Sequence, residues 1–118
     1  MMKIDSTVQF ADFKKPLDRV FQLAAQKARL LDATWDATRG TPVFTVEGKY
    51  TARGWTEWTQ GFQYGCAILA FDATDDRALL EIGRQKTVAR MSSHVTHIGV
   101  HDHGFNNLST YGNLRRLM

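Results

Sequence analysis

The segment from Thr59 to Thr74 constrains the fold of this chain more than any other, because apolar residues occupy almost every side of it. Read as a helix, it has hardly any polar face, and a helix that is apolar all round is buried all round. Gly61 and Gly65 each cost about 1 kcal/mol of helix propensity relative to alanine. Glycine is tolerable where neighbouring helices must approach closely, so the segment predicts an inner helix covered by other helices.

The segments on either side of this inner helix are one-sided. From Pro16 onward an apolar stripe recurs at helical spacing, with polar residues opposite. Its members are Leu17, Val20, Phe21, Ala24, Ala28 and Leu31. Residues 77–90 are amphipathic as well, and either member of the Asp75–Asp76 pair can cap that helix. A last helix should begin near Asp102 and run through Leu114.

The remaining stretches are predicted to be irregular. Residues 1–13 have no clear pattern, 38–42 form a turn cluster, 43–46 a short extended stretch, 48–54 a loop and 92–101 a second loop. Helices with one polar, solvent-facing side therefore alternate with helices that are covered by others. This alternation predicts an all-α fold in two layers, built from helical hairpins.

Composition places the chain among single globular domains. It has 118 residues, 43% of them hydrophobic and 23% charged, with a net charge of +3. No basic run predicts nucleic acid binding, no apolar run reaches the length of a membrane span, and no targeting segment opens the chain, so we expect a cytoplasmic protein. The single cysteine, Cys66, excludes an internal disulfide and is expected to be a small buried residue.

Two short motifs carry the information on function. They are Trp55-Thr56-Glu57-Trp58-Thr59-Gln60-Gly61-Phe62 and His101-Asp102-His103-Gly104-Phe105. Each mixes aromatic and polar side chains, continues with Gly-Phe and opens a predicted helix. Trp58 suits either a stacking platform for a sugar or a core position, and Asp102 suits either a ligand contact or a helix N-cap. Since both motifs open inner helices, Trp58 and Asp102 should lie at the same end of the fold.

From Trp58 to its last residue the chain resembles the unsaturated glucuronyl hydrolases of glycoside hydrolase family 88. In that family one inner helix opens with Trp-Thr-x-Gly-Phe and a later one with His-Asp-x-Gly-Phe, which Trp58–Phe62 and His101–Phe105 match. The resemblance implies an (α/α)6 barrel. Residues 1–118 would form about its first two hairpins, as the N-terminal part of a single catalytic domain. Gln63 departs from the family, which favours a second tryptophan there, and His103 stands where an apolar residue is usual.

The resemblance also implies site residues and a reaction. Asp102 would be one of two essential aspartates, and Trp58, His101 and Phe62 would bind the substrate. The substrate is an oligosaccharide with an unsaturated uronic acid. The related unsaturated rhamnogalacturonyl hydrolases belong to the same reaction class and have a similar barrel. An aspartic acid protonates the vinyl ether, water adds at C5, and the hemiketal collapses without a cofactor. Since the proton donor of the family lies on a later inner helix, the isolated chain is expected to be inactive.

Three other interpretations stay open. The four histidines between His94 and His103 have the density of a zinc site, but the remaining ligands would have to share one short loop, so no metal is predicted. Glu57 and Asp102 would make a glycosidase carboxylate pair only if the fold brought them together. The chain would otherwise be a non-catalytic helical module that binds a sugar or a protein. Its surplus of apolar surface predicts self-association.

Overall fold

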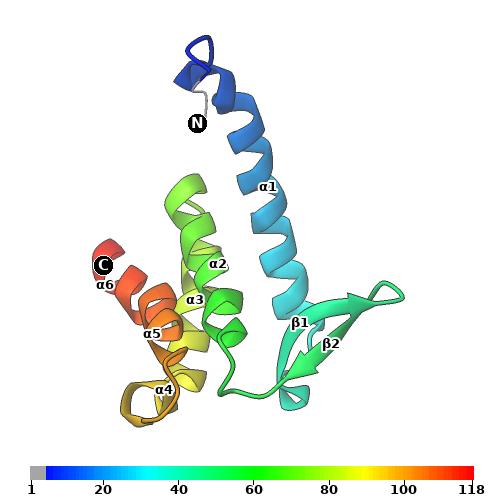
Figure 1. The fold of residues 1–118 in the computed structure, drawn as a ribbon, viewed down its shortest axis with the longest axis vertical. Helices are drawn as coiled ribbons and strands as arrows, with labels where there is room; N and C mark the ends of the chain where they lie inside the picture. The colour runs from blue at the N-terminus through cyan, green and yellow to red at the C-terminus, as the bar shows by residue number, and fades with distance from the viewer. Residues whose placement is uncertain (1–4) are drawn as a thin grey trace.

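The computed structural model describes residues 5–118, which form a mostly helical domain with one small β-hairpin (Figure 1). The elements are α1 (Phe10–Thr34), the 3-10 turn η1 (Ala37–Arg39), β1 (Thr41–Val46), β2 (Lys49–Arg53), α2 (Thr59–Thr74), α3 (Arg77–Arg90), α4 (Ser93–Thr96), α5 (His103–Asn107), the π-helical turn η2 (Leu108–Gly112) and α6 (Asn113–Leu117). The last three elements follow one another without a break and make one rod. Within residues 5–118, no helix is both long and apolar enough to cross a membrane.

The core lies where α2 packs between α1, α3 and α6. Its buried members are Ile68, Ala70, Phe71, Leu79, Leu80 and Leu114, with Ala25 and Ala28 of α1 packed against them. The expectation that α2 is buried on every side is wrong, because Phe62, Cys66 and Leu69 are exposed along one face. Phe62 and Cys66 line an open cavity between α2, α1 and the β-hairpin. Cys66 is therefore not the buried residue that its apolar neighbours predict.

Two glycines of α2 let the α5–η2–α6 rod pack against it at short range. A Cβ atom at Gly61 would lie 2.7 Å from the side-chain oxygen of Asn106, and one at Gly65 would lie 2.7 Å from the Ser109 carbonyl oxygen. Such short contacts are essentially never made by real Cβ atoms, so the close helix approach expected from the sequence is confirmed. Because the contacts advance together along both helices, α2 and the rod run in the same direction.

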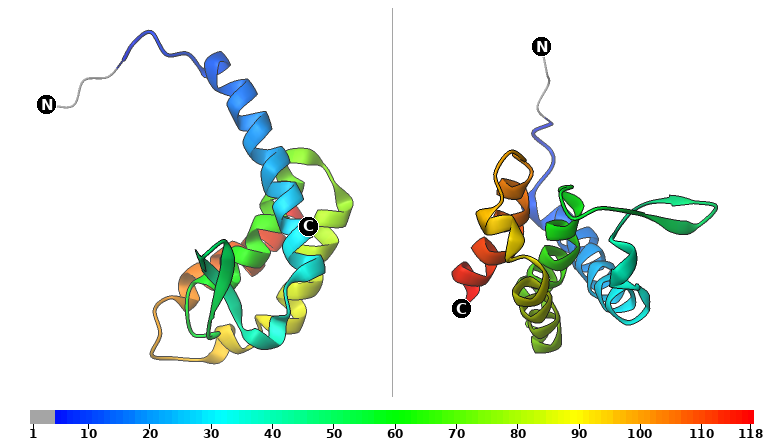
Figure 2. Two further views of the ribbon diagram at one scale, coloured as in Figure 1. Left: turned by 90° about the vertical axis from the view of Figure 1, so that its right-hand side faces the viewer. Right: turned by 90° about the horizontal axis from the view of Figure 1, so that it is seen from below.

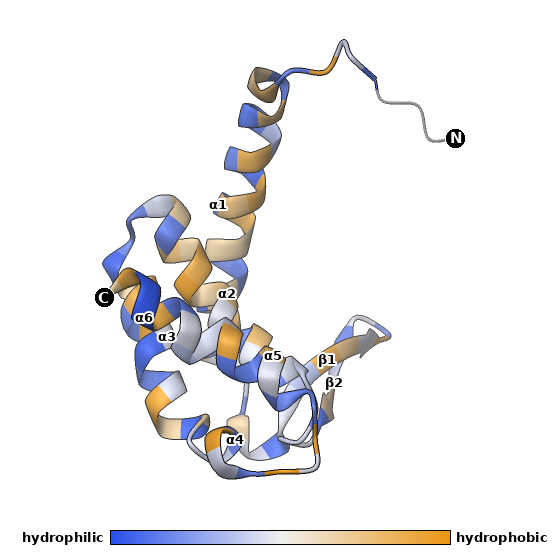
Figure 3. Cartoon of the chain, turned by 60° about the vertical axis from the view of Figure 1, so that its left-hand side comes forward, coloured by the Kyte–Doolittle hydropathy of each residue, from blue (hydrophilic) through white to orange (hydrophobic). Residues whose placement is uncertain are grey.

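Helix α1 begins well before Pro16, so its predicted start is wrong. The Gln9 amide donates to Asp12 Oδ2 at 2.8 Å and helps to close the first turn. A proline inside a helix deprives one carbonyl of its partner, and water can replace that partner because this half of α1 is exposed. Residues 10–23 are exposed, and Phe10 is 97% exposed, so this half of the apolar stripe is uncovered. The first turns of α1 extend beyond the other helices (Figures 2 and 3).

The segment 48–54, expected to be a loop, contains strand β2, which pairs antiparallel with β1. Val46 pairs with Lys49, so the loop between the strands is Glu47 and Gly48, with φ of 51° and 75°. Two consecutive positive φ angles are typical of the type I′ turn, whose twist suits a hairpin. The prediction fails because glutamate seldom adopts a positive φ, so Glu-Gly is a weaker turn signal than Asn-Gly.

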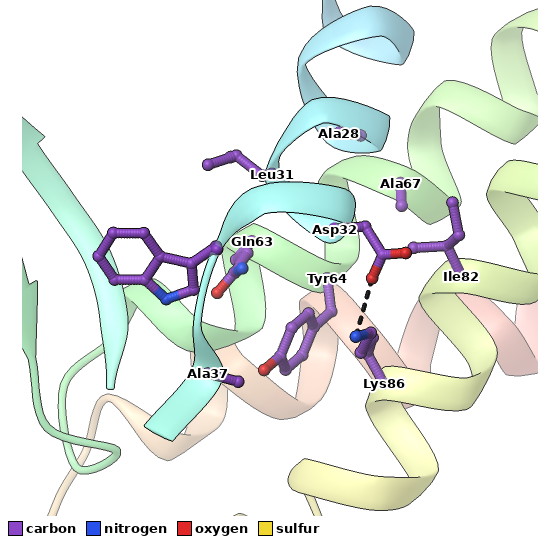
Figure 4. A pocket seen from close by; sticks show the side chains of 10 residues that line it. Ala28, Leu31, Asp32, Ala37, Gln63, Tyr64, Ala67, Ile82 and Lys86 are labelled. Atoms are coloured by element: carbon purple, nitrogen blue, oxygen red, sulfur yellow. Dashed lines mark ion pairs between the residues drawn. The ribbon is translucent and has the colours of Figure 1, made fainter. Parts of the chain in front are cut away.

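Ion pairs hold α1 to the α2–α3 hairpin. Asp32 Oδ1 of α1 lies 2.8 Å from Lys86 Nζ of α3 (Figure 4), and Arg29 pairs with Asp76. Asp76 also accepts from the Ala78 amide at 3.1 Å and so caps α3, as one of the two predicted caps. The cavity beside the Asp32–Lys86 pair measures only about 20 Å³, room for about one water molecule. This cavity is therefore a packing gap rather than a ligand site.

The chain after α3 follows the sequence expectation with one exception. The predicted loop 92–101 contains a single helical turn, α4, whose His94 side chain is buried. The predicted start of the last helix agrees with α5, since Asp102 is the residue that precedes it. The first turns of α2 and of α5 lie side by side, because Gly61 packs against Asn106.

Candidate functional site

The first motif places two aromatic rings at the start of α2. Trp58 precedes the helix and is 48% exposed, which excludes the core position considered from the sequence. Phe62, one turn later and also exposed, meets Trp58 edge-on, with ring centroids 5.3 Å apart and planes at 90°. Such an edge-to-face contact holds the indole in place while leaving apolar ring surface open to solvent.

The second motif places Asp102 directly before α5. Asp102 occupies the N-cap position of α5, as one interpretation of the sequence expects, but its side chain makes no capping hydrogen bond to the helix backbone. The side chain is 27% exposed, and His101 Nε2 lies 3.4 Å from Asp102 Oδ1. The His101 side chain is itself 91% exposed. The Asp102 carboxylate is therefore available to an external hydrogen-bond donor.

The two motifs meet at one pocket. An open cavity of about 290 Å³ is lined by two residues of each motif, Trp58, Phe62, Asp102 and Phe105. Three of the four site residues expected from the sequence thus come together, and the fourth, His101, stands beside Asp102 outside the lining. Glu57 does not line this pocket either, so the structure does not bring Glu57 and Asp102 together as a carboxylate pair within it.

Asn106, which the sequence reasoning missed, ties the two motifs together. This fully buried side chain accepts a hydrogen bond from the Gly61 amide through Oδ1 at 2.6 Å. Its Nδ2 donates to the carbonyl oxygens of Glu57 at 3.0 Å and Asp102 at 3.1 Å. One side chain therefore sets where the Trp58 segment lies relative to Asp102. The available signal was an asparagine inside a predicted helix, where this residue type is unfavourable unless its amide is used.

A histidine cluster lies next to this pocket, built from His94, His97 and His103 around Trp55. The His103 ring stacks on Trp55 with planes 10° apart, and His94 and His97 pack edge-on against both rings. His97 Nδ1 and His103 Nε2 share a hydrogen bond of 2.8 Å, and His94 Nε2 donates to the Trp55 carbonyl at 2.8 Å. Across residues 5–118, no group of three histidine, cysteine or acidic side chains is arranged to hold a metal ion.

Burial favours the neutral form of two of these imidazoles. His94 is 1% exposed and His103 is 4% exposed. Desolvation lowers the pKa of both rings; His97 lowers the pKa of His103 further, and the nearby Asp102 opposes that shift. For His94, the hydrogen bond to the Trp55 carbonyl opposes the effect of burial on the pKa. Both groups therefore resist protonation in the folded chain.

Acidification should destabilise the fold through these two histidines. Above about pH 6.5, the ordinary pKa of histidine in an unfolded chain, both rings are neutral in either state and their contribution is fully present. Below that value the unfolded chain binds protons that the folded chain resists. The free energy of unfolding then falls by at most about 1.4 kcal/mol per pH unit for each imidazole. Urea unfolding followed by circular dichroism between about pH 7.5 and about pH 5 measures this decrease.

Two variants separate this effect from general acid sensitivity. His103→Phe keeps an aromatic ring on Trp55 but cannot be protonated, so its stability should depend less steeply on pH. His101→Gln removes an exposed imidazole and should leave the pH dependence unchanged. Equal slopes in the two variants and the parent chain would show that the buried cluster does not control acid stability.

Comparisons with known proteins contribute no relative: no family model matches the chain, and no match is found among curated proteins or solved structures.

Proposed function

We propose that this chain supplies the substrate pocket of a glycoside hydrolase that acts on unsaturated uronyl oligosaccharides by hydrating the vinyl ether. The observation that carries the proposal is the shared pocket, in which Trp58 and Asp102 meet although they lie far apart in the sequence. An aromatic ring suits the apolar face of a pyranose, and a carboxylate accepts hydrogen bonds from its hydroxyl groups. The resemblance to the unsaturated glucuronyl hydrolases, which assigns both residues to the substrate site, supports the same proposal.

Each pocket residue has a defined role in this proposal. The sugar ring stacks on Trp58, and Phe62 holds the indole in place. Asp102 accepts hydrogen bonds from the sugar and orients it, while another aspartic acid, on a later inner helix of the family's barrel, gives its proton to C4. Water adds at C5, and the hemiketal opens to release the leaving sugar. His101, exposed beside Asp102, contributes a further hydrogen bond to the sugar.

The helix arrangement supports an (α/α)6 barrel as the setting. Helix α2 and the α5–η2–α6 rod run in the same direction in close contact, while α3 returns the chain between them. This is how neighbouring inner helices of such a barrel are connected. The exposed face of α2 with Phe62 and Leu69 would pack on further inner helices, and in the isolated chain it would favour self-association. We place this enzyme in the cytoplasm and expect it to need no cofactor.

A non-catalytic helical module that binds a sugar is the second candidate. The observation that favours it is the pocket itself, since Asp102 is the single carboxylate among the described residues that line it. One carboxylate is enough to bind a sugar. A proton donor distinct from Asp102 would have to enter the pocket from another segment.

Binding of an unsaturated uronyl disaccharide to the chain tests the pocket. Trp58→Ala should weaken binding about fivefold, because an aromatic contact contributes roughly 1 kcal/mol, and Trp58→Phe should retain part of the affinity. The matched control is Phe10→Ala, which removes an exposed aromatic ring far from the pocket. Calorimetric titration measures the affinities, and the ultraviolet absorbance of the double bond reports turnover, which we expect to be negligible. Equal affinity of Trp58→Ala and the parent chain would overturn the pocket assignment, and rapid turnover would overturn the module.

A further inference from the structure

Three arginines from distant elements line a second cavity next to the motif Trp55–Phe62. The open cavity measures about 620 Å³ and lies between η1, the end of β2, the start of α2 and the end of α3. Its arginines are Arg39, Arg53 and Arg90. Figure 1 shows these four chain segments at the same end of the molecule, the end at which α2 begins.

The guanidinium groups of these arginines are free to bind an anion. None of the three forms a salt bridge with a carboxylate in the described part of the chain. Arg39 lies over the Trp35 ring at 4.8 Å and Arg53 over the Phe44 ring at 6.0 Å, so aromatic faces support both groups. A guanidinium that stacks through its face keeps its N–H edges available for a planar or tetrahedral oxoanion.

The acidic groups near this cavity do not cancel its charge. Glu57 is the single carboxylate among the described residues of the lining, against three arginines. Asp36 lies just outside: its carboxylate accepts hydrogen bonds from Thr38, and together with the charges of Arg39 and Arg90 these bonds lower its pKa. The field inside the cavity is therefore positive and attracts an anion.

Gln60 adds an uncharged amide side chain to the lining of the cavity. This residue lines the cavity and is 8% exposed, and its Oε1 has no hydrogen-bond partner among residues 5–118. That oxygen is enclosed by the protein, so it is not a contact for a ligand in the open cavity. Trp55 adds an aromatic ring to the same lining.

We propose that this cavity binds the oxoanion group, a sulfate ester or a carboxylate, of a sugar ligand. The two cavities are neighbours along the chain, because Glu57 lines one and Trp58 lines the other. The assignment of the ligand as a sugar rests on the proposed function, whereas the anion site itself does not.

Calorimetric titration of the chain tests the site with three probes: inorganic sulfate, an unsaturated uronyl disaccharide and its sulfated form. Each Arg→Gln exchange should weaken binding of the sulfated disaccharide about threefold to fivefold, as for an exposed ion pair. The double variant Arg53→Gln/Arg90→Gln should lose about tenfold or more, and the loss should shrink at high salt. If only the sulfated form and inorganic sulfate lose affinity, sulfate is the bound group. If both disaccharides lose affinity equally, the bound group is the carboxylate.

The matched control is Arg84→Gln on α3, because Arg84 is already paired with Glu81 through two hydrogen bonds of 3.0 Å. Circular dichroism confirms folding, and the single variant Arg90→Gln serves if the double variant does not fold. The proposal is overturned if the cavity variants bind all three probes as Arg84→Gln does. Trp58→Ala should weaken both disaccharides and leave inorganic sulfate unaffected. Failure of the Trp58 pocket can thus be told apart from failure of the arginine site.

Discussion

Replacing Asn106 with leucine should lower the free energy of unfolding by about 4–6 kcal/mol. The change removes three hydrogen bonds of a fully buried side chain and leaves the Gly61 amide without its acceptor. Each lost bond contributes about 1 kcal/mol, and a stranded buried donor adds roughly 1–3 kcal/mol. Leucine has a similar volume, so the loss reflects hydrogen bonding more than packing. Urea unfolding at neutral pH measures the difference.

The matched control is Asn113→Leu on the same helical rod. Asn113 is partly exposed, and its Nδ2 donates to the Ser109 carbonyl within its own helix at 3.0 Å. This exchange should change the free energy of unfolding by no more than about 1 kcal/mol. Binding of the unsaturated disaccharide should also weaken in Asn106→Leu, because Trp58 and Asp102 lose their common support. Similar stability of the two variants would contradict the role assigned to Asn106.

Asp102→Asn should reduce turnover of an unsaturated uronyl disaccharide about 10²-fold or more, in an enzyme that contains this chain together with the proton-donating aspartate. The amide preserves size but removes the charge that orients the sugar, and misplacing a bound substrate can cost about 10²-fold in rate. Stability should change by less than about 0.5 kcal/mol, because the Asp102 side chain makes no capping bond that could be lost. Initial rates from the double-bond absorbance, with a urea titration on the same sample, measure both quantities.

The control for this variant is Asp75→Asn, at the exposed left-handed residue that ends α2. Asparagine tolerates this conformation, so neither turnover nor stability should change. Unchanged turnover in Asp102→Asn would leave this residue no part in the reaction and would favour the non-catalytic module. A large loss of stability with unchanged turnover would instead make Asp102 a structural residue.

The sequence by itself determined most of the helical core and the meeting of the two motifs at one end of the fold. The apolar segment 59–74 predicted an inner helix. Gly61 and Gly65 predicted the close contact with a second helix, because a residue without a side chain lets another backbone approach. The Gly-Phe steps after Trp58 and Asp102 located two helix starts at one end. Two helices separated by one returning helix must run in the same direction, so this expectation required no knowledge of side-chain contacts.

The tertiary structure alone decided which of these residues are buried and what they contact. Cys66 and Phe62 belong to an apolar helix, yet they are exposed because they line an open cavity beside α1 and the hairpin. Four histidines lie close together in the sequence. The sequence does not show that His94 and His103 are buried, because their burial depends on packing against Trp55 from another segment. The partners of Asn106 include Glu57 and Gly61, far away in the chain. A local pattern of apolar residues predicts where a helix forms, whereas burial and hydrogen-bond partners depend on contacts between distant segments.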